Sequence, residues 1–345
     1  GSRTTRGRSQ PVKEVFFVVS FKMLRAVVAL AASCLVRTAH AAVEADLVTS
    51  IPGFESLFAE SMPFETYSGY LAVDLSDAGL AYDSLSIHYE FHTCVKGPEA
   101  CPVAVWHQGG PGGSAVFGSW TEMGPFQMMS QGPVENLEHA WNNAANMLYL
   151  ESPAGSHIAE VDAKTGFSKC FTAGKMAKTC KWDDVTQAVA YAHTLKAFFA
   201  AFPEFLANDL YLVGESYAGQ FIPNIAYFLV QNPSVLGKNL TGIAVGNGCW
   251  GGTETEVLCN GANSEKHDID NYHGKALISD AQYAAIQAAC TFDAPRDASI
   301  RVRAAADLER AYGADCASLL LDAEDTVGNY NVYNVYDDCS LGRVA

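Results

Sequence analysis

One stretch decides the fold of this chain: Asn208-Asp-Leu-Tyr-Leu-Val-Gly-Glu-Ser-Tyr-Ala-Gly-Gln-Phe-Ile-Pro223. The apolar run from Leu210 to Val213 predicts a short buried strand that ends at Gly214. Residues from about Tyr217 to Val230 then follow the apolar pattern of a helix. A serine on so tight a turn from strand to helix is typical of a nucleophile elbow, in which helix N-terminal amides point toward a developing oxyanion. We therefore predict that Ser216 is a nucleophile.

A second predicted strand runs into a glycine-rich loop within Val103-Ala-Val-Trp-His-Gln-Gly-Gly-Pro-Gly-Gly-Ser114. Four glycines in the five positions 109–113 allow backbone N–H groups to come close to a ligand. In α/β-hydrolases such a loop gives one oxyanion donor, and the residue after the nucleophile gives the other. A phosphate-binding loop is the alternative, but neither a Gly-Lys-Ser/Thr sequence nor G-x-G-x-x-G spacing follows. The pattern favours a hydrolase.

Taken together, Gly-Glu-Ser-Tyr-Ala-Gly at 214–219 and Gly-Gly-Pro-Gly at 109–112 resemble the serine carboxypeptidases of the α/β-hydrolase class. Further segments between about Ile51 and Asp337 resemble the same family in the same order, namely Tyr67–Leu71, Glu122–Phe126, Trp141–Asn142, Ala145–Leu148, Glu151–Gly155 and Gly246–Gly248. The resemblance implies an α/β-hydrolase fold with a central, mostly parallel sheet and a helical cap inserted over the active site.

The chain divides into five predicted parts. Residues 1–22 are expected to be a disordered upstream extension, read through or added as a tag, with Met23 as the true start. Residues 23–41 have the basic start, short apolar run and Ala-x-Ala site of a secretory signal peptide. A basic extension before an internal anchor is the alternative. The hydrolase core is expected over 46–248, the helical cap over 249–333, and the start of the return to the core over 334–345, with the C-terminal strands missing.

Charge and cysteine content restrict the partners and the compartment. The chain has 38 acidic and 22 basic residues, a net charge of −16, which argues against nucleic acid or an anionic membrane as a partner. The leader's apolar run is too short to span a bilayer, so we expect no membrane anchor. Nine cysteines after the leader favour the secretory pathway, ending outside the cell or in a vacuole or lysosome. Asn239-Leu-Thr241 is a predicted glycosylation site.

Two local disulfides are suggested by spacing, although the sequence leaves the pairing open. A Cys94–Cys101 bridge would close a hairpin, and a Cys170–Cys180 bridge would close a second loop. Nine is an odd number, so one thiol is free or lacks its partner, and the family's usual cysteine is replaced by Gly113. We find no C-x-x-C pattern or metal-ligand spacing and expect neither a metal nor another cofactor. The oligomeric state is left open.

Apolar patterning predicts the remaining elements. An antiparallel strand pair is expected at Tyr67–Leu75 and Leu85–Phe91, and buried strands are expected at Val103–Gln108, Met147–Leu150 and Thr241–Val245. Helices are expected from Asp183 or Asp184 to about Phe202, from about Ser279 to Cys290, and from Asp297 to Leu321. The chain between Gly248 and His273 is rich in glycine, cysteine and charge, and we expect helices only after it.

The resemblance implies roles for five residues. Ser216 would form the acyl-enzyme, and the backbone N–H groups of Gly110 and Tyr217 would form the oxyanion hole. Glu215 and Gln108 would bind the free C-terminal carboxylate of a peptide or protein substrate. Because an ionised Glu215 would repel that carboxylate, it must be protonated, which predicts best binding at acidic pH. A second carboxylate nearby would extend that range upward.

Gln108 departs from the family, which has an asparagine before its paired glycines. Glutamine keeps the amide donor but moves it one methylene further from the backbone. The alternative is that Gln108 only closes the loop through local hydrogen bonds. We predict that Gln108→Asn changes KM and leaves kcat similar.

The remainder of a catalytic triad has no match in this sequence. In α/β-hydrolases the acid and then the histidine follow the serine, but only His267 and His273 follow Ser216, and the family's Gly-Asp and Gly-His motifs are absent. The chain therefore looks cut off before both partners. His267 as a replacement base is the alternative to a plain exposed loop histidine.

Three functions remain open from the sequence. The first is a serine carboxypeptidase. The second is a related acyltransferase, which Glu215 disfavours because that branch tends to have aspartate there. The third is an inert relative that binds or protects another protein.

Overall fold

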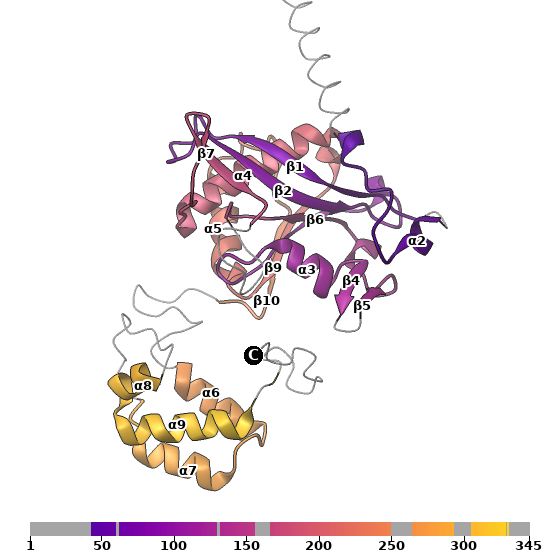
Figure 1. The fold of residues 1–345 in the computed structure, drawn as a ribbon. Helices are drawn as coiled ribbons and strands as arrows, with labels where there is room; N and C mark the ends of the chain where they lie inside the picture. The colour runs from indigo at the N-terminus through magenta and orange to yellow at the C-terminus, as the bar shows by residue number, and fades with distance from the viewer. Residues whose placement is uncertain are drawn as a thin grey trace, which may run out of the picture. The chain divides into compact units, whose positions relative to one another are not determined.

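The computed structural model describes residues 43–59, 62–129, 132–155, 166–249, 264–292, 305–328 and 330 (Figure 1). The chain divides into two compact units, Gly1–Ala45 and Asp46–Ala345, and within the first only the helical residues 43–45 are described. The predicted extension, the signal peptide and the segment 334–345 lie outside the described residues. The domain boundaries therefore stay predictions.

An eight-stranded mixed sheet forms the centre of the hydrolase core within the described part of the chain. Its order is β10-β9-β3-β6-β2-β7-β8, and β1 also pairs with β2. The strands are β1 (Thr66–Asp74), β2 (Ser84–His92), β3 (Val103–His107), β6 (Asn146–Leu150), β7 (Lys169–Thr172), β8 (Lys175–Met176), β9 (Leu210–Glu215) and β10 (Gly242–Gly246). β4 (Phe126–Met129) and β5 (Gly132–Glu135) form a separate antiparallel pair.

The parallel strands lie where the sequence has continuous apolar runs. Every residue of β3 and β6 is buried, as expected for parallel strands that are covered on both faces. β3 pairs in parallel with β6 on one side and with β9 on the other. The register places His107 opposite Gly214. Gln108, which follows β3, and Glu215, the last residue of β9, therefore lie at the same edge of the sheet.

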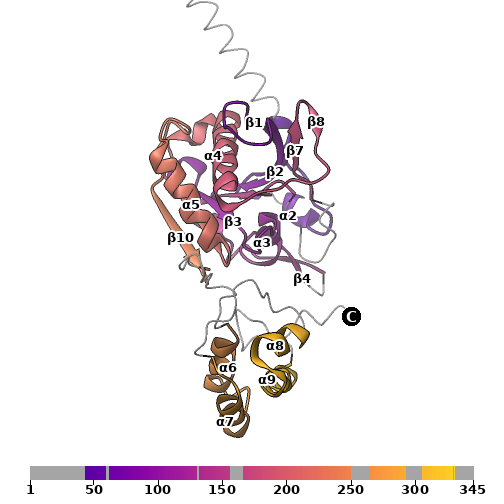
Figure 2. The same cartoon turned by 90° about the vertical axis from the view of Figure 1, so that its left-hand side faces the viewer.

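Helices cover both faces of this sheet (Figure 2). α4 (Asp184–Ala201) and α5 (Ala218–Gln231) pack against each other on one face, and α3 (Ala115–Thr121) packs on the other. α4 begins with a capping box at Asp183, and its C-cap, Phe202, directly precedes Pro203, as the sequence predicts. The short elements are α2 (Glu55–Ala59), η1 (Pro98–Ala100), η2 (Trp141–Asn143) and η3 (Pro203–Ala207).

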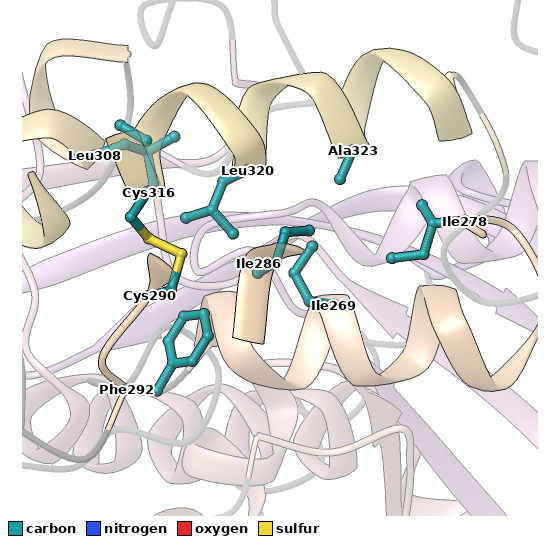
Figure 3. Close-up of a cluster of buried hydrophobic side chains, with 10 residues drawn as sticks. Ile269, Ile278, Ile286, Cys290, Phe292, Leu308, Cys316, Leu320 and Ala323 are labelled. Carbon is teal, nitrogen blue, oxygen red and sulfur yellow. A yellow bond between two sulfur atoms is a disulfide. The ribbon is translucent and has the colours of Figure 1, made fainter. Parts of the chain in front are cut away.

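The helical segment after the core has a hydrophobic core of its own (Figure 3). It consists of α6 (Ser264–Gly274), α7 (Asp280–Ala289), α8 (Ala305–Tyr312) and α9 (Ala314–Val327), and α9 contacts the other three. Its buried side chains are Ile269, Ile278, Ile286, Cys290, Phe292, Leu308, Cys316, Ala317, Leu320 and Ala323. These helices come from the part of the sequence in which we expect the cap.

Two predictions for this segment are wrong. The helix expected over Asp297–Leu321 is divided into α8 and α9 in its described part, because Gly313 adopts a φ of 85° that ends the helical path. Helix α6 lies where no helix was expected, since its sequence is largely polar and only Ile269 on it is fully buried. The other predicted strands and helices are present, with ends that differ by one or two residues.

The structure confirms both local disulfides, Cys94–Cys101 and Cys170–Cys180. A third bridge joins Cys290 to Cys316, and Cys249 is also disulfide-bonded. The Cys290–Cys316 bridge fastens the end of α7 to the start of α9 inside the helical core, as Figure 3 shows.

Loss of the Cys290–Cys316 bridge should destabilise the helical segment. The bridge closes a loop of 26 residues, so the double substitution Cys290→Ala and Cys316→Ala should lower the free energy of unfolding by about 3 kcal/mol. Urea unfolding followed by circular dichroism measures this change. The matched substitutions at Cys94 and Cys101, whose bridge spans seven residues, should cost less, and an equal or larger cost would contradict the loop-length argument.

Candidate active site

Ser216 lies on a sharp turn between β9 and α5. Its φ of 57° is in the left-handed region, which non-glycine residues rarely adopt and which is typical of strained functional positions. The Ser216 N–H donates to the Gly246 carbonyl at 3.1 Å, and the Ser216 carbonyl accepts from Gly219 N at 2.9 Å and Cys249 N at 2.8 Å. These three hydrogen bonds hold the strained turn in place.

The glycines around the turn are required by close approach of the backbone. A Cβ on Gly214 would lie 2.3 Å from the His107 carbonyl oxygen, and one on Gly219 would lie 2.7 Å from Cys249 N. Strand, turn and helix therefore pack too closely for a side chain at either position. The glycines on both sides of Ser216 have this physical cause.

The glycine-rich loop lies directly against the Ser216 turn. A Cβ on Gly109 would come within 2.6 Å of Ser216 Cβ and 2.7 Å of Tyr217 N. The next residue, Gly110, has a φ of 114°, which a side chain would strain. The structure thus brings together the two loops that carry Gly110 and Tyr217. Their role as oxyanion donors stays a prediction.

A cluster of one amide and two carboxyls lies beside the Ser216 turn. Gln108 Nε2 donates to Glu215 Oε1 at 2.8 Å and to Glu122 Oε1 at 3.2 Å. Trp106 Nε1 donates to Gln108 Oε1 at 2.8 Å, which fixes the orientation of the amide. Trp106 and Gln108 lie two residues apart, so both side chains point to the same face of the sheet. The cluster adjoins Ser216, because Glu215 is the preceding residue.

The two carboxyls of this cluster share protons. Burial raises the pKa of Glu122 to about 7, and the nearby charge of Glu215 adds to the effect. Burial also raises the pKa of Glu215, while hydrogen bonds from Gln108 and Glu122 act in the opposite direction. Both carboxyls therefore keep their protons to a higher pH than isolated glutamates do. Two desolvated carboxyls this close cannot both ionise readily.

A cavity of about 470 Å³ adjoins this site. Its lining includes Pro111 and Gly112 from the glycine-rich loop, Tyr217 and Phe221 from the start of α5, and Trp182 before α4. The cavity thus borders both loops that meet at Ser216.

Three of the histidines before the serine lie in the packed core. His88, His92 and His107 are largely buried, and burial lowers the pKa of each, to about 4, about 3 and about 4 respectively. His92 bonds to Thr66 and Ser119 through its two ring nitrogens. His139 is exposed and His193 is half-buried, while His157 lies outside the described residues.

The two histidines after the serine both lie on α6. His267 is exposed on this helix, which corrects the expectation that it lies in a loop. His273 Nε2 pairs with Asp280 Oδ1 at 2.8 Å. Within the described ranges, no hydrogen bond joins a histidine to Ser216 Oγ. A general base is therefore not assigned.

The residues that the structure describes contain no group of His, Cys, Asp and Glu able to hold a metal ion. In the same residues no helix is both long and apolar enough to cross a membrane. Asn239 is exposed, and its glycosylation stays a prediction.

Residues 52–344 match the family model described as "Serine carboxypeptidase". This chain belongs to the serine carboxypeptidase family. It is 34% identical to the lysosomal protective protein of Mus musculus over 315 residues, which cover 88% of the chain and 54% of that relative. It is 31% identical to serine carboxypeptidase-like 34 of Arabidopsis thaliana over 259 residues, covering 73% of the chain and 46% of that relative. The chain therefore spans about half the length of these family members.

The fold is shared with solved hydrolases as well. The crystal structure of a prohormone-processing carboxypeptidase from Saccharomyces cerevisiae matches with a TM-score of 0.50 and 21% identity, covering 77% of this chain and 54% of that one. At this identity the match supports the α/β-hydrolase fold alone. The predicted fold class and family are thus confirmed for this family member.

The sequence predictions missed Glu122 as a site residue. The segment Glu122–Phe126 was noted only for its resemblance to the family, and nothing in its local pattern indicates a functional carboxyl. The one available clue was the expectation of a second carboxylate near Glu215, and in the structure Glu122 is that carboxylate.

Proposed function

We propose that this protein is a serine-type carboxypeptidase, which removes C-terminal residues from peptides or proteins through an acyl-enzyme on Ser216 and works best at acidic pH. The observation that carries this proposal is the cluster of Gln108, Glu122 and Glu215 directly beside the nucleophile. A site for endopeptidase or general esterase chemistry has no need of a proton-sharing carboxyl pair at this position.

The cluster supplies what recognition of a free C-terminus requires. A peptide carboxylate needs hydrogen-bond donors that carry no negative charge. Gln108 Nε2 becomes such a donor when one of its two N–H groups turns from Glu122 or Glu215 to the substrate, and a protonated Glu215 is a second. Glu122 supports Glu215 because the pair retains protons at pH values where isolated carboxyls ionise. The carboxylate of the terminal residue would bind here, one residue beyond the bond that Ser216 attacks.

The chemical step uses the strained turn. Ser216 Oγ would attack the last peptide carbonyl, and the N–H groups of Gly110 and Tyr217 would stabilise the oxyanion. The leaving amine would carry the terminal residue away and leave an acyl-enzyme. A base is required as well, which takes the serine proton and returns it to the leaving amine, and no residue of the described chain is assigned to it. Water would then hydrolyse the acyl-enzyme and restore Ser216.

The disulfides support a place in the secretory pathway, since such bonds persist in oxidising compartments. A vacuole or lysosome suits the acidic pH dependence of the carboxyl pair, and release from the cell is the other destination we predict. The substrate is a peptide or protein C-terminus, and no cofactor is required for the chemistry.

One second function has a specific observation in its favour. No described histidine contacts Ser216, and the second candidate is therefore a protein that binds a peptide C-terminus without cleaving it. It would then act as a binding or protective protein. This function and the carboxypeptidase function share the same carboxylate site and differ only in the chemistry at Ser216.

Incubation with an N-blocked dipeptide at pH 5 distinguishes these functions. A carboxypeptidase releases the free C-terminal amino acid, spares the dipeptide amide, and loses activity on Ser216→Ala. Binding without release supports the protective protein. Transfer of an acyl group from a glucose ester to an added alcohol, with no peptide cleavage, supports the acyltransferase. Equal cleavage of acid and amide would contradict recognition of the C-terminus.

A further inference from the structure

We propose that helix α4 is a clamp that sets the spacing of the two oxyanion donors, through Gln187 toward one loop and Asp184 toward the other. The proposal rests on the oxyanion role that we propose for Gly110 and Tyr217. Gln187 and Asp184 touch neither Ser216 nor the substrate-carboxylate cluster in the described contacts. They are positioning residues.

The first connection runs from α4 to the glycine-rich loop through His107. The Nδ1–H of His107 donates to the Gln108 carbonyl at 2.7 Å, and Gln187 Nε2 donates to His107 Nε2 at 2.9 Å. A carbonyl can only accept, so Nδ1 carries a proton. The Gln187 N–H can only donate, so Nε2 accepts and carries none, and the ring is neutral. The Gln108 carbonyl belongs to the peptide that leads into Gly109 and Gly110. Gln187 thus holds the start of the loop through one imidazole ring.

Packing on both faces keeps that ring in place. The ring of His107 stacks on Tyr191 of α4, with centroids 5.1 Å apart, and packs against Phe221 of α5 at 4.6 Å. Phe221 in turn contacts the ring of Tyr217 at 5.0 Å. His107 is 2% exposed, so water cannot replace Gln187 as its partner without an opening of the core.

The second connection runs from α4 to the nucleophile turn. Tyr217 Oη donates to the Asp184 carboxylate, at 3.2 Å from Oδ2 and 3.4 Å from Oδ1. Tyr217 follows Ser216 and carries the other proposed oxyanion N–H. The adjacent Asp183 does not compete for this hydroxyl, because its carboxylate caps the helix through Val185 N and Thr186 N.

Both connections start from one face of a single rigid element. Asp184 and Gln187 are three residues apart on α4, so their side chains lie on the same side of the helix. They reach the ends of β3 and β9, which are neighbours in the sheet with His107 opposite Gly214. Figure 2 shows α4 and α5 side by side next to β3. Cutting either connection frees one donor loop and removes no donor, nucleophile or carboxylate-binding group.

Four variants of the 345-residue chain test the clamp. Gln187→Met removes the donor to His107, and Asp184→Ala removes the acceptor of Tyr217. Asp184→Asn keeps an acceptor and should rescue the effect. Thr194→Val is the matched control for Gln187→Met. Thr194 is as deeply buried on α4 as Gln187, but its hydroxyl donates to the Ala190 carbonyl within the helix.

Backbone amide exchange, measured by mass spectrometry, gives the first result. We expect Gln187→Met to accelerate exchange in residues 108–113, and Asp184→Ala to accelerate it in residues 215–219. Each acceleration should be about fivefold, which corresponds to the loss of one ordinary hydrogen bond. The Asp184→Asn and Thr194→Val variants should stay within about twofold of the unsubstituted chain. Unchanged exchange in both loops, or the same acceleration in Thr194→Val, would overturn the clamp.

A kinetic comparison separates positioning from mere stabilisation. The rate at which a fluorophosphonate labels Ser216 should fall in Gln187→Met and in Asp184→Ala. The affinity for an N-blocked dipeptide acid should not change in Gln187→Met, which is the variant that decides, because Asp184 also lines the cavity beside the site and Gln187 does not. Parallel losses of rate and affinity would contradict a role confined to the oxyanion hole. If the unsubstituted chain neither labels nor binds the dipeptide, the proposed function fails, and the exchange rates still decide whether α4 holds the two loops.

Discussion

Substitution of both Glu122 and Glu215 by glutamine should make the affinity for a dipeptide acid independent of pH between about 5 and 8. In the unsubstituted chain the same affinity should fall by roughly a hundredfold over this range. Glu122 and Glu215 must be protonated to donate to a peptide carboxylate. At a pH above the pKa of either carboxyl, binding must first restore its proton, which costs about tenfold in affinity per pH unit. The sign follows from the raised pKa of each carboxyl, with that of Glu122 at about 7. Binding is therefore strong at acidic pH and is lost as the pH rises through 7.

Calorimetry at several pH values measures this dependence directly. At pH 5 the double variant should bind within about threefold of the unsubstituted chain, because an amide donates as a protonated carboxyl does. At pH 8 it should bind more tightly than the unsubstituted chain. Glu138→Gln, which changes an exposed carboxyl, is the control and should leave the pH dependence unchanged. A double variant that keeps the original pH dependence would show that other groups control binding.

The substitution Gly109→Ala should slow fluorophosphonate labelling of Ser216 by roughly a hundredfold or more, the usual cost of an oxyanion donor. The new Cβ would lie 2.6 Å from Ser216 Cβ and 2.7 Å from Tyr217 N, and the second of these atoms belongs to the backbone of the turn. Since neither loop can yield without displacing its neighbour, the methyl group should push the two oxyanion donors apart. Mass spectrometry of the labelled peptide gives the rate.

Gly246→Ala is the matched control for this prediction. Gly246 also lies beside the turn, and its carbonyl accepts from Ser216 N, but a Cβ there meets nothing within 4 Å among the described residues. We expect its labelling rate to stay within about threefold of the unsubstituted chain. Equal rates for Gly109→Ala and the unsubstituted chain would mean that the glycine-rich loop does not form the oxyanion hole.

The parts of the fold that the sequence predicts well have strong local signals. β3 and β9 begin with the continuous apolar runs Val103–Trp106 and Leu210–Val213, and α4 lies between the capping Asp183 and Pro203. Helix α6 lacks such a signal, since a polar sequence with one fully buried side chain resembles a loop. The break at Gly313 was missed for a different reason, because a single glycine in a helical pattern is often tolerated and its backbone angle is not visible in the sequence.

The candidate site follows the same rule. Ser216 and its neighbours form one contiguous motif, so their sequence suffices to find them. The contact between Gln108 and Glu215 joins residues 107 positions apart, and the contact with Glu122 joins residues 14 apart across a loop and a helix. Only the strand order and the placement of α3 bring these side chains together. The contact of Gln187 with His107 likewise depends on how α4 packs on the sheet, and no local sequence pattern reveals it.

The most direct measurement is a calorimetric titration of the 345-residue chain at pH 5 with an N-blocked dipeptide and, in parallel, with the same dipeptide amidated at its C-terminus. We predict that the acid binds at least about tenfold more tightly than the amide, and that Gln108→Leu abolishes the difference. Near pH 7, titrations in buffers of different ionisation enthalpy should show that the protein takes up protons when the dipeptide acid binds. Equal affinities for acid and amide, with no proton uptake, would contradict a C-terminal carboxylate site beside Ser216.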